Sequence, residues 1–247
     1  MKFLFYLLSL VPKSLFEYLI DIYLSLGVYK YSSGFKVTSK NIEIAFPDRN
    51  KKDVALLAKR SFKESIISGY ESIYTWGRND AKVNSNILRI ENNYLINNLK
   101  ESGLIAVSFH NRSVDMLLTW MNSQHTTTSL FKKIKNNTLN TFVKQRRESK
   151  NSKCYETNIS GVKEILKSLK NNNIVCFAAD QVPKRGFGEY IDFFNVKAYT
   201  TTLVQSLVNK TEANVMYFFI QSSPDNDINI ILKPVSYTHL RAHETSV

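Results

Sequence analysis

The sequence contains little cysteine, glycine or proline, and these shortages limit the kinds of protein it can encode. Only two cysteines occur, Cys154 and Cys176, and their spacing is not of the metal-binding type. We therefore expect two reduced thiols in a cytoplasmic compartment, and no disulfide framework. Eight glycines and five prolines are spread over 247 residues, and no Gly-, Ser- or Pro-rich linker or internal repeat divides the chain. The sequence therefore predicts one folded domain after its N-terminal segment.

A long uncharged hydrophobic run is also missing. Residues 1–31 are apolar and aromatic, but they are interrupted at Pro12, Lys13, Glu17 and Asp21. Because a helix needs about 20 largely apolar residues to span a bilayer, the segment predicts no spanning helix. A signal peptide would fit Lys2 and the short apolar core, yet no small-residue cleavage site follows. We expect residues 1–35 to form two helices that lie in or against a membrane surface; two ordinary core helices are the alternative.

Positive charge is abundant. Lysine and arginine number 33 against 21 aspartates and glutamates, which gives a formal net charge of +12. Such a surplus favours polyanionic partners, namely nucleic acid, anionic lipid headgroups or an acidic carrier protein. No helix-turn-helix, zinc-finger or aromatic RNA-binding signature is visible. We therefore expect no nucleic-acid partner. A basic nucleic-acid-binding protein is the alternative if the chain is not an enzyme.

Strand-like and helix-like patterns alternate along the chain. Apolar runs predict buried strands at 103–109, 174–180, 214–220 and 228–235. Helical spacing of apolar residues predicts helices at 53–76, 114–121, 161–169 and 201–213. This alternation predicts an α/β fold, a single domain with a central mixed sheet flanked by helices. In such folds functional residues gather at the carboxyl ends of strands.

His110 and Asp180 both follow predicted strands, and four residues separate His110 from Asp115. An unperturbed imidazole, with a pKa of about 6.5, can take a proton from a hydroxyl near pH 7. A carboxylate on the other ring nitrogen fixes the tautomer and stabilises the imidazolium. The His110–Asp115 spacing therefore favours a general base acting on an alcohol, although a structural His and a surface Asp explain it equally well. No G-x-S-x-G motif occurs, so a covalent intermediate is not expected.

A longer pattern carries more information. The segment "NNNIVCFAADQVPKRGFGEYIDFFNVKAYTTTLVQSLVNKTEANVMYFF", with "FHNRSVD", "NIEIAFPD" and the apolar N-terminus, resembles the bacterial lipid A biosynthesis acyltransferases. These are the lauroyl/myristoyl group within the lysophospholipid acyltransferase superfamily. The resemblance runs from about residue 5 to residue 235. It implies a glycerol-3-phosphate acyltransferase-like fold, with an acyltransferase domain at 36–235 on the cytoplasmic face of the inner membrane.

The resemblance also implies roles for individual residues. The family's catalytic His and acid, separated by four residues, match His110 and Asp115, and its intervening Arg matches Arg147. Its second block matches Asp180-Gln181, Gly186 and Gly188, Phe193-Phe194 and Thr200. The family more often has Glu as the acid, in a Gly-Asn-Trp-Glu context, whereas this chain has "NRSVD". A His-x4-Asp pair is usual in glycerolipid acyltransferases, but their Phe-Pro-Glu-Gly-Thr block is replaced here by "FAADQVP".

We therefore expect His110, oriented by Asp115, to deprotonate an acceptor hydroxyl that attacks an acyl thioester on acyl carrier protein. The acceptor is a lipid A precursor; a lysophospholipid or aminolipid hydroxyl is the alternative. No cofactor and no metal are expected. Asp180 is expected to pair with an arginine. The remaining candidates for support or substrate binding are Arg147, Gln181, Lys184, Arg185 and Thr200.

Some candidate residues have plain alternatives. Lys184 and Arg185 would bind a lipid A phosphate or the acidic carrier, or else be solvated charges. Phe187, Phe193 and Phe194 would line an acyl slot, or else belong to the core.

The last segment, "SYTHLRAHETSV" at 236–247, resembles a translated sequencing-adapter fragment. We expect it not to be native and the natural C-terminal sequence to be missing. His239, His243 and Glu244 in this segment have the spacing of a helical zinc site, but no third ligand is evident.

Overall fold

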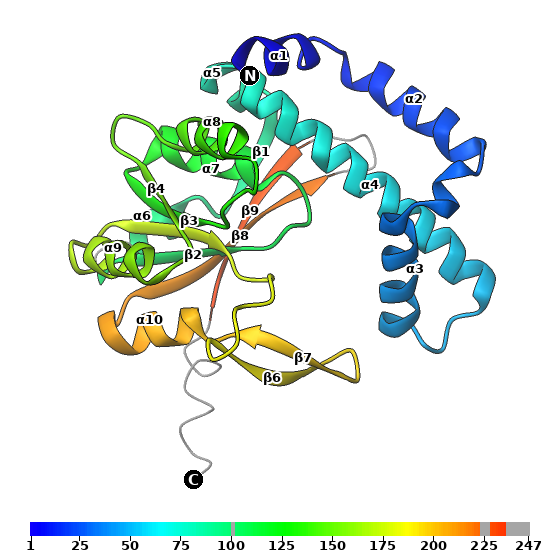
Figure 1. Ribbon diagram of the computed structural model, residues 1–247. Coiled ribbons are helices and arrows are strands. Elements are labelled where there is room, and N and C mark those ends of the chain that lie inside the picture. The colour runs from blue at the N-terminus through cyan, green and yellow to red at the C-terminus, as the bar shows by residue number, and fades with distance from the viewer. Residues whose placement is uncertain (100–101, 223–227, 236–247) are drawn as a thin grey trace.

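The computed structural model describes residues 1–99, 102–222 and 228–235. A seven-stranded sheet runs in the order β1-β9-β8-β2-β5-β3-β4, and β6 and β7 form a separate two-stranded hairpin. Strands β8 and β9 are antiparallel, whereas the other neighbours in the large sheet are parallel. The predicted α/β domain with a mixed central sheet is therefore confirmed (Figure 1).

The strands of the large sheet are β1 (Ile87–Glu91), β2 (Leu104–Ser108), β3 (Thr127–Phe131), β4 (Lys153–Glu156), β5 (Ile174–Ala178), β8 (Asn214–Ser222) and β9 (Ile228–Pro234). The hairpin strands are β6 (Gly188–Phe193) and β7 (Val196–Thr201). The helices are α1 (Lys2–Leu8), α2 (Lys13–Ser25), the 3-10 helix η1 (Val28–Tyr31), α3 (Ser33–Ala45), α4 (Lys51–Gly77), α5 (Asp80–Asn84), α6 (Tyr94–Leu99), α7 (Val114–Gln124), α8 (Asn137–Arg147), α9 (Ile159–Lys170) and α10 (Leu203–Thr211).

The central strand β2 is buried along its whole length, because helices cover both faces of the sheet. Its residues alternate between two cores, as the period of a strand requires. Leu104 and Ala106 face the core formed with α7, and Ile105 and Val107 face the core formed with α9 and α10. A strand that is buried on both faces has a continuous run of apolar residues, and this run predicted β2 from the sequence.

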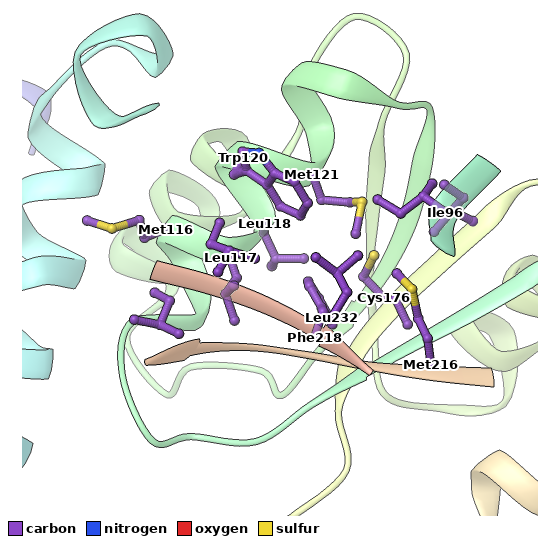
Figure 2. Packing of buried hydrophobic residues seen from close by; sticks show 14 of the residues in the cluster. Ile96, Met116, Leu117, Leu118, Trp120, Met121, Cys176, Met216, Phe218 and Leu232 are labelled. Atoms are coloured by element: carbon purple, nitrogen blue, oxygen red, sulfur yellow. The ribbon is translucent and has the colours of Figure 1, made fainter. Parts of the chain in front are cut away.

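Helix α7 contributes more buried residues to the first core than any other helix. Leu117, Leu118, Trp120 and Met121 pack toward Phe218 of β8 and the neighbouring strands (Figure 2). Ser113 begins this helix, because its hydroxyl accepts a hydrogen bond from the main-chain N–H of Met116 at 3.3 Å. The helix is therefore fixed both by its cap and by its apolar face.

Helices α1, α2 and α3 lie along the long helix α4, to one side of the sheet (Figure 1). Ile20 and Leu24 of α2 pack on Ile67 of α4, so one face of α2 belongs to a core. Large apolar residues elsewhere on α1 and α2 are exposed, namely Phe3, Leu4, Tyr6, Leu7, Leu8, Leu15, Tyr18, Leu19 and Ile22. The two predicted helices are present, and their contact with a membrane stays a prediction.

Length and composition give no membrane-spanning helix on its own among the described residues. The pair α1 and α2 meets the same criteria when taken together, with a bend of 78° between them.

Candidate active site

The two loops that follow β2 and β5 meet at one edge of the sheet. These strands are parallel neighbours with Ser108 opposite Ala178, and the N–H of Ala179 donates to the carbonyl of Ser108 at 3.0 Å. From β2 the chain continues through α7 to β3, and from β5 through α10 to β8, on the opposite side of β2. Because α7 and α10 lie on opposite faces of the sheet, the chain changes direction here, and such switch points are where α/β proteins bind ligands.

His110 and Asp180 lie on these two loops and contact each other directly. Oδ1 of Asp180 is 2.7 Å from Nδ1 of His110, and Oδ2 accepts the main-chain N–H of His110, also at 2.7 Å. One carboxylate therefore holds both the ring and the backbone of the histidine. The sequence placed both residues at strand ends, and the structure brings them together.

The structure corrects the predicted partner of His110. Asp115 does not orient His110; it is buried in the first turn of α7 and accepts hydrogen bonds from Arg147 at 2.6 Å (Nε) and 3.0 Å (Nη2). The prediction that Asp180 would pair with an arginine is also wrong, because both oxygens of its carboxylate bind His110. The cap at Ser113 starts the helix at Val114, so the next side chain points toward α8 rather than back to the end of β2.

The Asp115–Arg147 pair joins the start of α7 to the end of α8. Burial lowers the pKa of the Arg147 guanidinium, but the charge of Asp115 and its hydrogen bond outweigh burial and raise the pKa above its ordinary value. The arginine therefore stays charged. Its carbonyl also accepts a hydrogen bond from the Asn122 side chain at 2.9 Å. Arg147 thus binds α7 through both Asp115 and Asn122, and its role in supporting the site or binding substrate stays a prediction.

The contact with Asp180 sets the chemistry of the imidazole. An ionised carboxylate only accepts hydrogen bonds, so this contact selects the tautomer of the neutral imidazole with the proton on Nδ1 and the lone pair on Nε2. The amide nitrogen of Gln181 lies 3.5 Å from Nε2. The His110 side chain is 48% exposed, so Nε2 can receive a substrate hydroxyl.

A groove of about 680 Å³ adjoins this pair. Its wall is formed by the ends of β2 and β5, the β6–β7 hairpin, the start of α10 and β8. The apolar residues in the wall are Val107, Phe109, Ala179, Ile191, Phe193, Val204, Val215, Tyr217 and Val235. Asp180 and Thr200 also line it. Phe187, just before β6, and Phe194, in the turn between β6 and β7, do not line the groove and are exposed. Of the three phenylalanines predicted for an acyl slot or the core, Phe193 alone lines the groove.

Two glycines and a tyrosine shape the loop between β5 and β6. Gly186 has a φ of +88°, a left-handed conformation that favours glycine. At Gly188 an added Cβ would lie 2.4 Å from the carbonyl oxygen of Thr200. The hydroxyl of Tyr199 accepts the N–H groups of Gly186 at 2.9 Å and Gly188 at 3.1 Å. The loop is therefore held against the hairpin.

Lys184 and Arg185 lie exposed on this same loop. Neither forms a salt bridge with any residue in the described ranges. Their ammonium and guanidinium groups are therefore open to solvent on the loop that follows Asp180.

The sequence did not identify the residues that hold the loop after His110. Arg112 is only 4% exposed and binds Glu71 and Glu64 of α4. A signal was present, because Glu71 lies on the apolar face of the predicted helix at 53–76, beside Ile67 and Tyr70. A carboxylate on a buried face requires a cationic partner.

The described residues form no metal-binding cluster, and both cysteines are buried. Among the residues that the structure describes, no group of three or more His, Cys, Asp or Glu side chains could hold a metal ion. His239, His243 and Glu244 lie outside the described residues, as does the whole segment predicted to be non-native. Burial raises the pKa of both Cys154 and Cys176, so their thiols stay protonated and are poor nucleophiles.

Comparison with known proteins agrees with the predicted resemblance. The family model for bacterial lipid A biosynthesis acyltransferases matches residues 2–242, nearly the whole chain. No curated protein matches the chain.

Proposed function

The chain belongs to the bacterial lipid A biosynthesis acyltransferase family, and from this premise we propose that it moves a fatty acyl chain from acyl carrier protein to a hydroxyl of a lipid A precursor. His110 is the general base of this proposal. The observation that carries it is the contact of His110 with Asp180, beside an apolar groove and with Nε2 accessible.

The reaction follows from the tautomer that Asp180 imposes. Nε2 of His110 takes the proton of the acceptor hydroxyl while the hydroxyl oxygen attacks the thioester carbonyl. Asp180 stabilises the imidazolium through Nδ1. The tetrahedral intermediate then collapses, the C–S bond breaks, and the carrier thiolate receives the proton from Nε2. The products are the acylated lipid and free carrier thiol, and His110 returns to its neutral form.

The groove supports a long acyl chain as substrate. Ligand pockets typically hold about 300–1,000 Å³, and the volume of about 680 Å³ lies within this range. Its wall is largely apolar, and Asp180 forms part of it. An acyl chain in the groove would place its thioester end near His110, while the apolar wall accommodates the methylene groups.

Charge and surface support the donor and the location. Lys184 and Arg185 are exposed on the loop that follows Asp180, and the chain carries a net charge of +12. Both features suit an acidic carrier protein, a lipid phosphate or anionic headgroups. The exposed apolar side chains of α1 and α2 suit contact with the inner membrane from its cytoplasmic face.

A second acceptor class remains, because Asp115 stands where the family more often has Glu. The same base would serve a lysophospholipid or aminolipid hydroxyl.

The test uses purified protein in detergent, acyl carrier protein bearing a labelled acyl chain, and a tetra-acylated Kdo-lipid A precursor, with products followed by mass spectrometry. We expect a mass gain of one acyl group that His110→Ala abolishes. His125→Ala is the matched control, because His125 ends α7 and lies outside the groove. Transfer only to a lysophospholipid would assign the second acceptor class, and transfer to neither acceptor would refute the proposal.

A further inference from the structure

We propose that Arg112 is a positioning residue, which clamps the loop after His110 to helix α4 and so holds His110 against Asp180. The proposal deepens the proposed function and rests on it for its catalytic consequence. Its structural part, that Arg112 fixes this loop, stands independently of the reaction.

Arg112 makes a dense set of contacts away from the groove. Its Nε donates to Oε2 of Glu71 at 3.0 Å, and its two terminal nitrogens form ion pairs with Glu71 and Glu64. One terminal nitrogen also lies 3.4 Å from the hydroxyl of Ser222, at the end of β8. The guanidinium therefore joins the loop to both α4 and β8.

The arrangement requires a guanidinium. Glu71 is 2% exposed and receives two nitrogens of the fork, while Glu64, two helical turns earlier, receives the third. Burial lowers the pKa of Arg112, but the hydrogen bond and charge of Glu71 outweigh it and raise the pKa above its ordinary value. A lysine would keep one charge but could not bind two carboxylates with a planar fork.

The rest of the loop is also anchored, and Arg112 supplies the charged part of the anchor. The Asn111 side chain donates to the carbonyl of Ile220 at 2.5 Å, and the Ser113 hydroxyl lies 3.0 Å from that of Ser72. His110, at the start of the loop, has an exposed side chain and is held by Asp180. If the loop moved, the hydrogen bonds between His110 and Asp180 would therefore lengthen or break.

Helix α2 reaches the same cluster. Nζ of Lys13 is 3.7 Å from Oε1 of Glu71. Glu71 therefore binds both Lys13 of α2 and Arg112 of the loop after His110, so this buried carboxylate connects α2 to that loop.

The chain offers a matched control in Arg146. This arginine is also bound to the region of α4, through the carbonyls of Thr75 at 3.1 Å and Arg78 at 2.6 Å, but it comes from α8 rather than from the loop after His110. Arg146→Lys makes the same change of side chain at an arginine that binds main-chain carbonyls and, at 3.6 Å, Asp80, and it leaves the ion pairs of Arg112 in place.

The first experiment is hydrogen exchange by mass spectrometry on the full chain in detergent. We expect Arg112→Lys and Glu71→Gln to speed exchange in peptides covering residues 109–113, where the N–H of His110 donates to Asp180. Arg146→Lys should leave these peptides unchanged. Wild-type exchange in Arg112→Lys, or a uniform increase over the whole molecule, would overturn the clamp.

The second experiment measures kcat and KM separately in the acyl-transfer assay. Because a misplacement of about 1 Å can cost about 100-fold in rate, we expect Arg112→Lys to lower kcat by about 10- to 100-fold with little change in KM. In an Asp180→Asn background the same substitution should cost much less, since the contact that it protects is already lost. A change in KM alone, or equal losses in both backgrounds, would overturn the positioning role.

The two experiments test the proposed function and the clamp independently. Absence of acyl transfer by the wild-type chain would refute the proposed function, while hydrogen exchange would still decide whether Arg112 holds the loop.

Discussion

Asp180 uses its two carboxylate oxygens on two different nitrogens of His110, the ring Nδ1 and the main-chain N, each at 2.7 Å. The same contact therefore selects the tautomer of the neutral imidazole and holds the loop that carries it. Asp115, the acid that lies closer to His110 in the sequence, is instead bound to Arg147. This exchange of partners gives the two aspartates different functions, and substitutions can separate them.

Asp180→Asn should lower kcat without unfolding the protein. An asparagine can turn its amide to donate to Nδ1, which would place the ring proton on Nε2 and remove the base. We expect a loss of about 10²- to 10⁴-fold in kcat, as for other histidine bases in the wrong tautomer. Acyl transfer and circular dichroism check the two parts. Asp192→Asn, in the exposed ion pair with Lys197, is the control and should retain activity.

Asp115→Asn should act mainly on stability. It leaves the partly buried Arg147 guanidinium without a counter-charge, which should cost about 2–4 kcal/mol, less than the ~3–5 kcal/mol typical of a fully buried pair. Unfolding in urea measures the change. Glu43→Gln breaks the exposed pair with Lys40 and should cost less than about 1 kcal/mol. If Asp115→Asn instead abolished kcat and left stability unchanged, the pairing expected from the sequence would be right and Asp180 would lose its assigned role.

Much of the central sheet could be predicted, because buried strands read as apolar runs. The strands at 104–108, 174–178, 214–222 and 228–234 lie where the sequence indicated them. The missed strands lack such runs. Strand β1 is largely exposed, and β4 pairs with β3 alone at the other edge of the sheet. Strand β3, "TTSLF", begins with polar residues and depends on its two neighbours.

The site was predictable in its location but not in its pairing. His110 and Asp180 each follow an apolar run, and that pattern placed both at strand ends. Which carboxylate meets the imidazole depends on the register of β2 with β5, which sequence spacing does not contain. Arg112 was missed for a related reason, since its partners Glu64 and Glu71 are more than 40 positions away on another element.

The thiols of Cys154 and Cys176 should resist alkylation in the folded protein at pH 8. Burial raises the pKa of both, so the reactive thiolate is suppressed. In the unfolded chain each pKa returns to about 8.5, so the thiols ionise there first and their contribution to stability declines as pH rises above about 8.5. Iodoacetamide labelling followed by mass spectrometry checks this. Labelling in urea should modify both residues, and rapid labelling without urea would contradict the buried environment.

The exposed apolar side chains of α1 and α2 should determine binding to membranes. Phe3 and Leu19 are exposed on these helices, and a carboxylate at either position cannot enter the acyl boundary of a bilayer without a large desolvation cost. We expect Phe3→Glu and Leu19→Glu to reduce co-sedimentation with vesicles that contain anionic phospholipid, while the melting temperature changes little.

The control for this prediction is Ile159→Glu, which places the same charge at an exposed apolar position at the start of α9, a helix that packs on the sheet. If general hydrophobicity drove the binding, all three variants would lose it equally. If only the positive charge of the protein mattered, then high salt would release the wild-type chain and each glutamate would have the same small effect. Selective loss in Phe3→Glu and Leu19→Glu, with binding that persists at high salt, would assign the contact to the N-terminal helices.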